Sequence, residues 1–235
     1  TEKHFNPRRA GLRAAGPRFQ RLWAQFEERH AELQKNAPDT PVNRPRREVF
    51  EMCRRAGEGE QGVYRLTVPT GGGKTLSGLA FALRHVLKHT LERVVVAIPY
   101  TSIIEQTARK YREVLGEDAV IEHHSNVAWK EDDEGREMTS RIQLATENWD
   151  APVIVTTNVQ LFESLLSNKS ARCRKLHNLA RSVIVLDEVQ TLPVELLETT
   201  LDVLRTLVQE YGVTVVLSTA TQPAFGGESP YLKGF

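Results

Sequence analysis

Apolar residues along the chain follow two different spacings, and the change near residue 62 divides the sequence. In the first part they recur every three or four residues, the period of a helix buried along one face. These positions are Phe19, Leu22, Trp23, Phe26 and Leu33. Pro38 and Pro41 end this helix, and a second helix is predicted at about 45–56. We therefore expect residues 1–62 to form a helical lead-in and not a separate domain.

From residue 63 on, short and almost wholly apolar runs alternate with helical patterns. The runs are VYRLTV (63–68), RVVVAIP (93–99), APVIVTT (151–157), RSVIVLDEV (181–189) and VTVVLSTAT (213–221). Strands without polar alternation are buried on both faces, as in parallel sheets. Helices are predicted between them, at about 74–89, 102–115, 158–167 and 193–211. This alternation predicts a doubly wound α/β domain over residues 63–235, with a mainly parallel sheet and helices on both faces.

Charge and cysteine content narrow the classes of function. The chain has 31 Lys and Arg against 30 Asp and Glu, a net charge of +1. Dedicated duplex-binding domains are usually far more basic, so any nucleic-acid site here must be local. Cys53 and Cys173 have no metal-ligand spacing and are typical of free thiols in a cytosolic protein. No apolar run approaches the roughly 18 residues of a membrane span.

The segment VPTGGGKT (68–75) predicts a phosphate-binding loop between a strand and a helix. Its glycines let backbone N–H groups point at phosphates, and the following helix begins with its positive dipole end. A lysine in this position reaches the β- and γ-phosphates of a nucleotide, and the threonine hydroxyl binds Mg²⁺. The predicted nucleotide-binding residues are Thr70, Gly71, Gly72, Gly73, Lys74 and Thr75. The full pattern has glycine at position 68, where this chain has Val68.

A second strand supplies the carboxylates that a P-loop enzyme needs. VIVLDEVQ places Asp187 and Glu188 directly after an apolar run. Asp187 is expected to hold Mg²⁺ together with Thr75, while Glu188 orients and deprotonates the attacking water. The predicted catalytic residues are Lys74, Asp187 and Glu188, and the predicted cofactors are ATP and Mg²⁺.

TGGGKT, DEVQ and STAT (218–221) together resemble the superfamily 2 helicases, whose motif I commonly lacks the first glycine. The resemblance implies a RecA-like fold and a role for Thr219 and Thr221 in coupling ATP hydrolysis to movement. It also implies that an upstream residue grips the adenine. Arg46 and Arg47 are the two candidates; the sequence does not choose between them, and Arg47 stands in the predicted nucleotide site.

Two further segments, IPYTSIIEQ (98–106) and VTTNVQLFESL (155–165), resemble the DNA-contacting motifs of the same helicases. Strand ends and helix starts offer hydroxyls and backbone N–H groups to phosphates of single-stranded DNA. The resemblance implies DNA contacts by Pro99, Thr101, Thr156, Thr157 and Gln160. The alternative for Thr157 is capping of the following helix.

The combination of ATENWDAPVIVTTNVQLFESL (145–165) with DEVQTLP (187–193) narrows the resemblance to the CRISPR-associated helicase–nuclease of type I systems, with the I-C branch as a candidate. It implies a cytoplasmic prokaryotic enzyme that an RNA-guided surveillance complex recruits to an R-loop. There it translocates on the displaced single DNA strand, unwinds the target and degrades it.

The family's nuclease domain and second RecA-like domain have no counterpart in this sequence. We therefore expect residues 1–62 to follow a missing nuclease domain and residues 63–235 to be the first RecA-like domain, with little or no activity alone. Two alternatives stay open. The chain could be the translocase domain of a restriction system, or a nucleotide- or partner-binding module without motor activity, for example a target of phage inhibitor proteins.

Overall fold

A single parallel sheet organises the described part of the chain. The computed structural model describes residues 15–124, 146, 148–167 and 175–220, with side chains from residue 18 on. The strands are β1 (Val63–Thr67), β2 (Arg93–Ile98), β3 (Val120–His123), β4 (Val153–Thr157), β5 (Ser182–Leu186) and β6 (Thr214–Thr219). They lie in the order β1-β6-β5-β2-β4-β3, and every described pair is parallel. This arrangement confirms the predicted doubly wound α/β fold.

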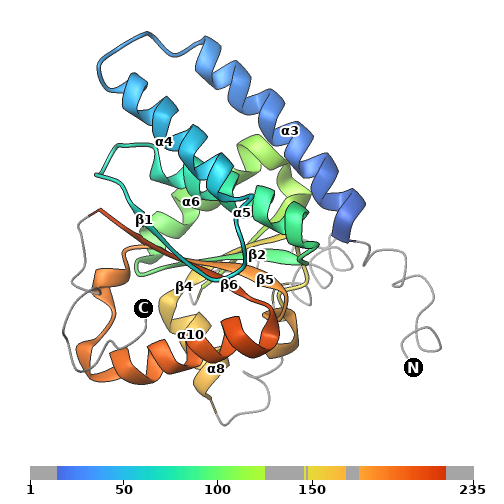
Figure 1. Ribbon diagram of the computed structural model, residues 1–235, viewed down its shortest axis with the longest axis vertical. Helices are drawn as coiled ribbons and strands as arrows, with labels where there is room; N and C mark the ends of the chain where they lie inside the picture. Colours follow the sequence, from blue (N-terminus) through green and yellow to red (C-terminus); the bar gives the residue numbers. More distant parts are fainter. Residues whose placement is uncertain (1–14, 125–145, 147, 168–174, 221–235) are drawn as a thin grey trace, which may run out of the picture.

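Helices cover both faces of the sheet (Figure 1). On one face lie α3 (Ala15–Lys35), α4 (Asn43–Ala56), α5 (Lys74–His89) and α6 (Thr101–Leu115), and on the other lie α8 (Asn158–Leu166) and α10 (Leu197–Tyr211). Short 3-10 turns η1 (Glu117–Ala119), η2 (Leu176–Asn178), η3 (Val189–Thr191) and η4 (Val194–Leu196) complete the connections. No helix in the described residues is both long enough and apolar enough to cross a membrane.

The two faces of the sheet have separate hydrophobic cores, which explains the lack of polar alternation in the strands. Along β2, Val94 and Val96 pack in one core, while Val95 and Ala97 between them pack in the other. Each residue of β2 thus meets a helix layer whichever way it points, whereas β1, at the edge of the sheet, alternates between exposed and partly buried residues. Trp149, fully buried, belongs to the second core.

The lead-in helices α3 and α4 pack in the core that lies on the α5 face of the sheet. Phe19 and Phe26 of α3 and Phe50 of α4 are buried in one cluster with α5 and α6. Leu33 is the exception in the helical pattern, because its side chain is 52% exposed. The helical prediction for this region is confirmed, and α3 ends at Lys35, before Pro38. The proposed domain boundary at residue 62 stays a prediction.

His85 is a buried polar bridge between three elements. Its ring in α5 lies 3.1 Å from the Gly57 carbonyl at the end of α4 and 2.8 Å from the Thr214 hydroxyl in β6. The neutral ring satisfies both contacts when Nδ1 donates to the carbonyl and Nε2 accepts from the hydroxyl. Burial is the main reason that the His85 pKa falls from 6.5 to about 4.

We expect this histidine to make the fold acid-sensitive. The folded state binds the proton less readily than the unfolded state, so its contribution is complete above pH 6.5 and is lost as the pH falls toward 4. The His85 share of the unfolding free energy should drop by about 2 kcal/mol between pH 7 and pH 5. Urea unfolding of wild type and His85→Gln at both pH values measures this share. His177→Gln, at an exposed position of η2, is the control. Equal pH slopes for wild type and His85→Gln would contradict the expectation.

Candidate nucleotide-binding site

The loop between β1 and α5 has the backbone that the P-loop pattern predicts. Gly71 and Gly73 have φ of +81° and +85°, in the left-handed region that favours glycine. A Cβ at Gly72 would lie 2.5 Å from Cγ1 of Val68 and 2.9 Å from the Pro69 carbonyl oxygen. All three glycines are therefore required by the loop itself. Lys74 is the first residue of α5, so the amino end of that helix faces the loop.

Val68, which replaces the first glycine of the full pattern, is a core residue. Its backbone N–H donates to the Thr219 carbonyl at 3.1 Å and extends the pairing of β1 with β6 by one step. Its side chain is 4% exposed and packs where Gly72 has no side chain. A valine fits here because the loop begins to curl only after this position.

The carboxylates after β5 meet the lysine of the loop. The Lys74 ammonium lies 2.5 Å from Oε1 of Glu188 and 3.0 Å from Oδ1 of Asp187. Glu188 reaches this position with a left-handed backbone, φ 48°. The structure thus brings together the three predicted catalytic residues. Lys74 follows β1 and its glycine loop, while Asp187 and Glu188 follow β5, and β6 separates these two strands in the sheet.

Opposing effects set the protonation of this cluster. Burial lowers the pKa of Lys74, but the hydrogen bonds and charges of Glu188 and Asp187 outweigh burial and leave that pKa above its ordinary value. Burial raises the pKa of Glu188, but hydrogen bonds from Lys74 and Gln190 outweigh burial and leave that pKa below its ordinary value. Lysine and glutamate are therefore both charged at neutral pH.

Two residues at the end of β6 contact the acidic cluster, Ser218 directly and Thr219 through Gln190. Ser218 donates to Oδ1 of Asp187 at 2.8 Å, and Thr219 donates to the side-chain oxygen of Gln190 at 2.6 Å. The Gln190 amide in turn donates to Oε2 of Glu188 at 2.6 Å. Thr219 thus contacts the acidic cluster through one intermediate side chain. Thr221 lies outside the described residues.

Sequence reasoning missed Ser218 and Gln190 as members of the site. Both stand inside the motifs used to find their neighbours, STAT and DEVQ. Their position in these motifs could have marked them as site residues. Which side chains they contact depends on how β5 pairs with β6, and the motifs do not show that pairing.

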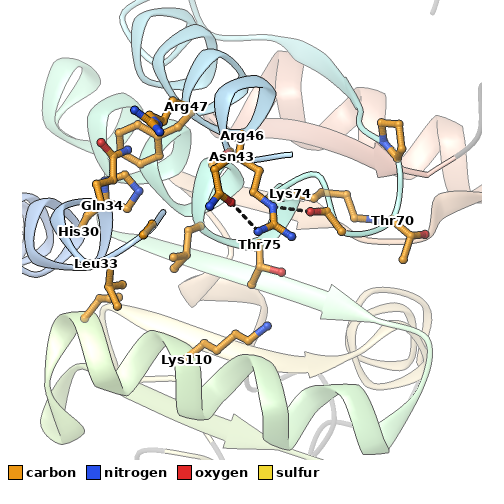
Figure 2. A pocket seen from close by; sticks show the side chains of 18 of the residues that line it. His30, Leu33, Gln34, Asn43, Arg46, Arg47, Thr70, Lys74, Thr75 and Lys110 are labelled. Atoms are coloured by element: carbon orange, nitrogen blue, oxygen red, sulfur yellow. Dashed lines mark hydrogen bonds between the residues drawn. The ribbon is translucent and has the colours of Figure 1, made fainter. Parts of the chain in front are cut away.

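Arg46 contacts the P-loop, and Arg47 contacts the turn before α4. Nε of Arg46 donates to the Gly71 carbonyl at 2.7 Å, and Nη1 donates to Oδ1 of Asn43 at 2.9 Å (Figure 2). Arg47 donates to the Asp39 carboxylate at 2.9 Å. Both arginines line a cavity of about 600 Å³ that also includes Thr70 and Thr75. The predicted contact of Arg47 with the nucleotide stays a prediction.

The predicted DNA-contacting residues lie at the ends of β2 and β4, on the same edge of the sheet. Pro99 and Thr101 are partly exposed there, and so is Gln160. The Thr156 hydroxyl is buried and donates to the His123 carbonyl at 2.8 Å. Thr157 caps α8 by accepting from the Gln160 N–H at 2.9 Å, so the alternative role foreseen for it is observed. The DNA role of the whole set stays a prediction.

Comparison with known proteins agrees with this geometry. The family model for the DEAD/DEAH box helicases matches residues 47–226. The chain belongs to the DEAD/DEAH box helicase family. The match covers the P-loop, both carboxylates and the end of β6, and confirms the superfamily predicted from the motifs.

Sequence similarity confirms the resemblance to the CRISPR-associated helicase–nucleases. The CRISPR-associated nuclease/helicase Cas3 of Haloferax volcanii is 33% identical over 230 residues. The alignment covers 84% of this chain and 24% of that protein, so the chain spans about a quarter of the length of this relative.

Solved structures show the same RecA-like fold. T. fusca Cas3 matches with a TM-score of 0.57 and 21% identity over 83% of this chain and 23% of that one. T. fusca Cas3 with AMPPNP matches with a TM-score of 0.53 and 23% identity over 74% and 20%. At these sequence identities, the structural similarity shows a shared fold alone.

Proposed function

We propose that this chain binds Mg²⁺-ATP and forms the first motor domain of an ATP-driven DNA helicase. The observation that carries the proposal is the meeting of Lys74 with Asp187 and Glu188 at the mouth of a glycine loop. The two carboxylates neutralise the lysine. An ATP phosphate is the natural replacement partner for the ammonium, since the loop and the helix end already favour an anion there.

Each residue then has a chemical role in hydrolysis. The N–H groups of Gly71 and Gly73 face the phosphates, while the Gly72 N–H donates to the Pro69 carbonyl and holds the loop, and Lys74 moves its charge to the β- and γ-phosphates. Release from Lys74 frees Oε1 of Glu188 to orient the attacking water and accept its proton. Gln190 holds the other oxygen of Glu188 and limits its rotation. Ser218 and Thr219 contact this cluster from β6, so a change at the phosphates can be transmitted to that strand.

The residues present fit a magnesium ion. Oxygen ligands suit Mg²⁺, which usually takes one or two carboxylates plus substrate phosphates in place of a complete protein cage. Thr75 and Asp187 line the same cavity and would supply a hydroxyl and a carboxylate. Within the described residues no group of three or more His, Cys, Asp or Glu could hold a metal without other ligands. Bound Mg²⁺ would neutralise charge on the phosphates during their transfer.

In the longer protein we propose that the domain moves along single-stranded DNA. The relative from Haloferax volcanii is named a CRISPR-associated nuclease/helicase, which supports this direction. By the same similarity, the DNA is the strand displaced in an R-loop, the recruiting partner is a type I surveillance complex, and the setting is the prokaryotic cytoplasm. The partly exposed strand ends at Pro99 and Thr101 would contact DNA phosphates.

Replacing the loop lysine tests the nucleotide site. Lys74→Ala should weaken Mg²⁺-ATP binding by about 10- to 100-fold, because charge-assisted hydrogen bonds contribute about 1.5–3 kcal/mol. Titration calorimetry of the 235-residue chain measures the affinity, and thermal melting checks the fold. Lys88→Ala, at the far end of the same helix, is the matched control. Equal affinities of wild type and Lys74→Ala would refute the assignment.

A further inference from the structure

Helix α6 contributes a buried tyrosine hydroxyl to the base of the nucleotide site. The Tyr111 side chain is 3% exposed, and its hydroxyl donates to the Thr75 carbonyl at 3.4 Å. Thr75 is the second residue of α5, so this contact lies in the helical turn that directly follows the glycine loop. A side chain of α6 therefore bonds to the residue whose own hydroxyl we propose as a ligand of Mg²⁺.

The hydroxyl of Tyr111 stands on a helix face that is otherwise mainly apolar. Ile104, Ala108 and Tyr111 are spaced i, i+4 and i+7, which places them on one face of α6, and all three are buried in the same hydrophobic core. A phenylalanine ring would supply the same apolar surface. Burying a hydroxyl costs free energy unless the group is hydrogen-bonded. The hydroxyl thus adds a directed contact to the nucleotide site and no apolar packing.

The charge of Asp187 also acts on this hydroxyl. Burial raises the pKa of Tyr111 above its ordinary value, and the Asp187 carboxylate raises that pKa further. The oxygen therefore keeps its proton at neutral pH and acts as a hydrogen-bond donor. Asp187 and Thr75 are the two residues that would hold Mg²⁺. Tyr111 interacts with both, by charge with the first and by a hydrogen bond with the second.

The Thr75 carbonyl can accept the tyrosine hydroxyl without leaving the helix. A carbonyl oxygen has two lone pairs, and the N–H group four residues further along the helix takes one of them. A hydrogen bond to the other lone pair limits movement of the first turn of α5, and with it the position of the Thr75 hydroxyl. Mg²⁺ demands near-ideal octahedral geometry, so small ligand shifts weaken its binding. Groups that orient metal ligands often change metal affinity by about 10- to 100-fold.

The helix that carries Tyr111 is itself a wall of the cavity. Lys110, Glu113 and Val114 line the cavity from α6, and Figure 2 shows Lys110 extending from that helix toward Thr75. Lys110 thus faces the cavity, while its neighbour Tyr111 faces the core. The hydrogen bond from Tyr111 joins this wall to the first turn of the P-loop helix.

We propose that Tyr111 is a positioning residue for the Mg²⁺ of the nucleotide, because its hydroxyl holds the first turn of α5 where the Thr75 hydroxyl meets the ion. The proposal rests on the proposed binding of Mg²⁺-ATP at the P-loop. Tyr111 acts through Thr75 and not on the phosphates. Its effect is therefore confined to the part of ATP binding that depends on Mg²⁺.

The ratio of the ATP affinity with Mg²⁺ to that in EDTA, here called the magnesium advantage, isolates this role. Calorimetry of the 235-residue chain measures both affinities. Tyr111→Phe should lower the magnesium advantage by about 2- to 10-fold, the loss expected for one neutral hydrogen bond, and leave the affinity in EDTA unchanged. Thr75→Ala removes the proposed ligand and should lower the advantage at least as much. Adding Tyr111→Phe to Thr75→Ala should have no further effect, because no hydroxyl is left to position.

Tyr64→Phe is the matched control, since it also removes a hydroxyl that donates to a backbone carbonyl, that of Glu60 at 2.5 Å. It should keep the wild-type magnesium advantage even if thermal melting shows a lower stability. Tyr111→Phe contradicts the proposal if it keeps the wild-type advantage, or if it weakens ATP binding equally with and without Mg²⁺.

Two further results would overturn the positioning role while the phosphate site stands. One is a wild-type chain that binds ATP equally well with Mg²⁺ and in EDTA. The other is an effect of Tyr111→Phe on the magnesium advantage that is as large in Thr75→Ala as in wild type. If wild type binds no ATP under either condition, the proposed function fails, and the role of Tyr111 fails with it.

Discussion

Glu188→Gln should lower ATP hydrolysis by about 10²- to 10⁴-fold in the longer protein that we propose, the usual contribution of a general base. The glutamine keeps the size of the side chain but cannot accept a proton from water. Hydrogen bonds from Lys74 and Gln190 keep the Glu188 pKa below its ordinary value, so the wild-type group is ionised at neutral pH. ATP-driven unwinding should be abolished together with hydrolysis.

Binding and hydrolysis must be measured separately to interpret this change. Single-turnover hydrolysis reports the chemical step, and an equilibrium titration shows whether the variant still binds Mg²⁺-ATP. Glu195→Gln, at an exposed position a few residues further on, is the matched control.

Asp187→Ala should also abolish unwinding, through loss of the proposed Mg²⁺ ligand. Nicking by a separate nuclease site should survive both changes. Unwinding by Glu188→Gln at the wild-type rate would remove Glu188 from the role of base.

The 235-residue chain by itself should hydrolyse ATP about 10³- to 10⁵-fold more slowly than the longer protein, and should not unwind DNA. An arginine finger in related phosphoryl-transfer enzymes accelerates the reaction by that factor. Of the two arginines that line the cavity in the described residues, Arg46 bonds to Gly71 and Asn43, and Arg47 bonds to Asp39. Each guanidinium thus already bonds to protein groups. The chain also spans only about a quarter of its relative, so we expect the missing charge from a second domain.

Phosphate release with and without single-stranded DNA measures this difference. Lys74→Ala of the same chain corrects for contaminating ATPases. The net charge of +1 gives little general attraction to DNA, so added single strands should stimulate hydrolysis little. Strong DNA-stimulated turnover by the chain alone would show that its catalytic site is complete.

The glycine loop and the acidic pair could be found from the sequence because their chemistry depends on adjacent residues. Gly71–Thr75 act through their own backbone and one helix end, and Asp187 and Glu188 follow directly from a buried strand. Helix and strand positions were equally readable, since the apolar runs of β2 and β5 have no polar alternation. The edge strand β3 was not predicted, because its four residues are too short a pattern to indicate a strand.

By itself, the sequence determined the fold class, the family and the residues that handle phosphate, because periodicity and short-range motifs encode them locally. Only the tertiary structure decided which side chains complete the site. Ser218 reaches Asp187 because β6 pairs with β5, and Arg46 reaches Gly71 across 25 positions of sequence because α4 packs on α5. The lead-in helices likewise belong to the nucleotide cavity because α3 packs against both α5 and α6. Such contacts depend on the register and packing of distant segments, which no local pattern specifies.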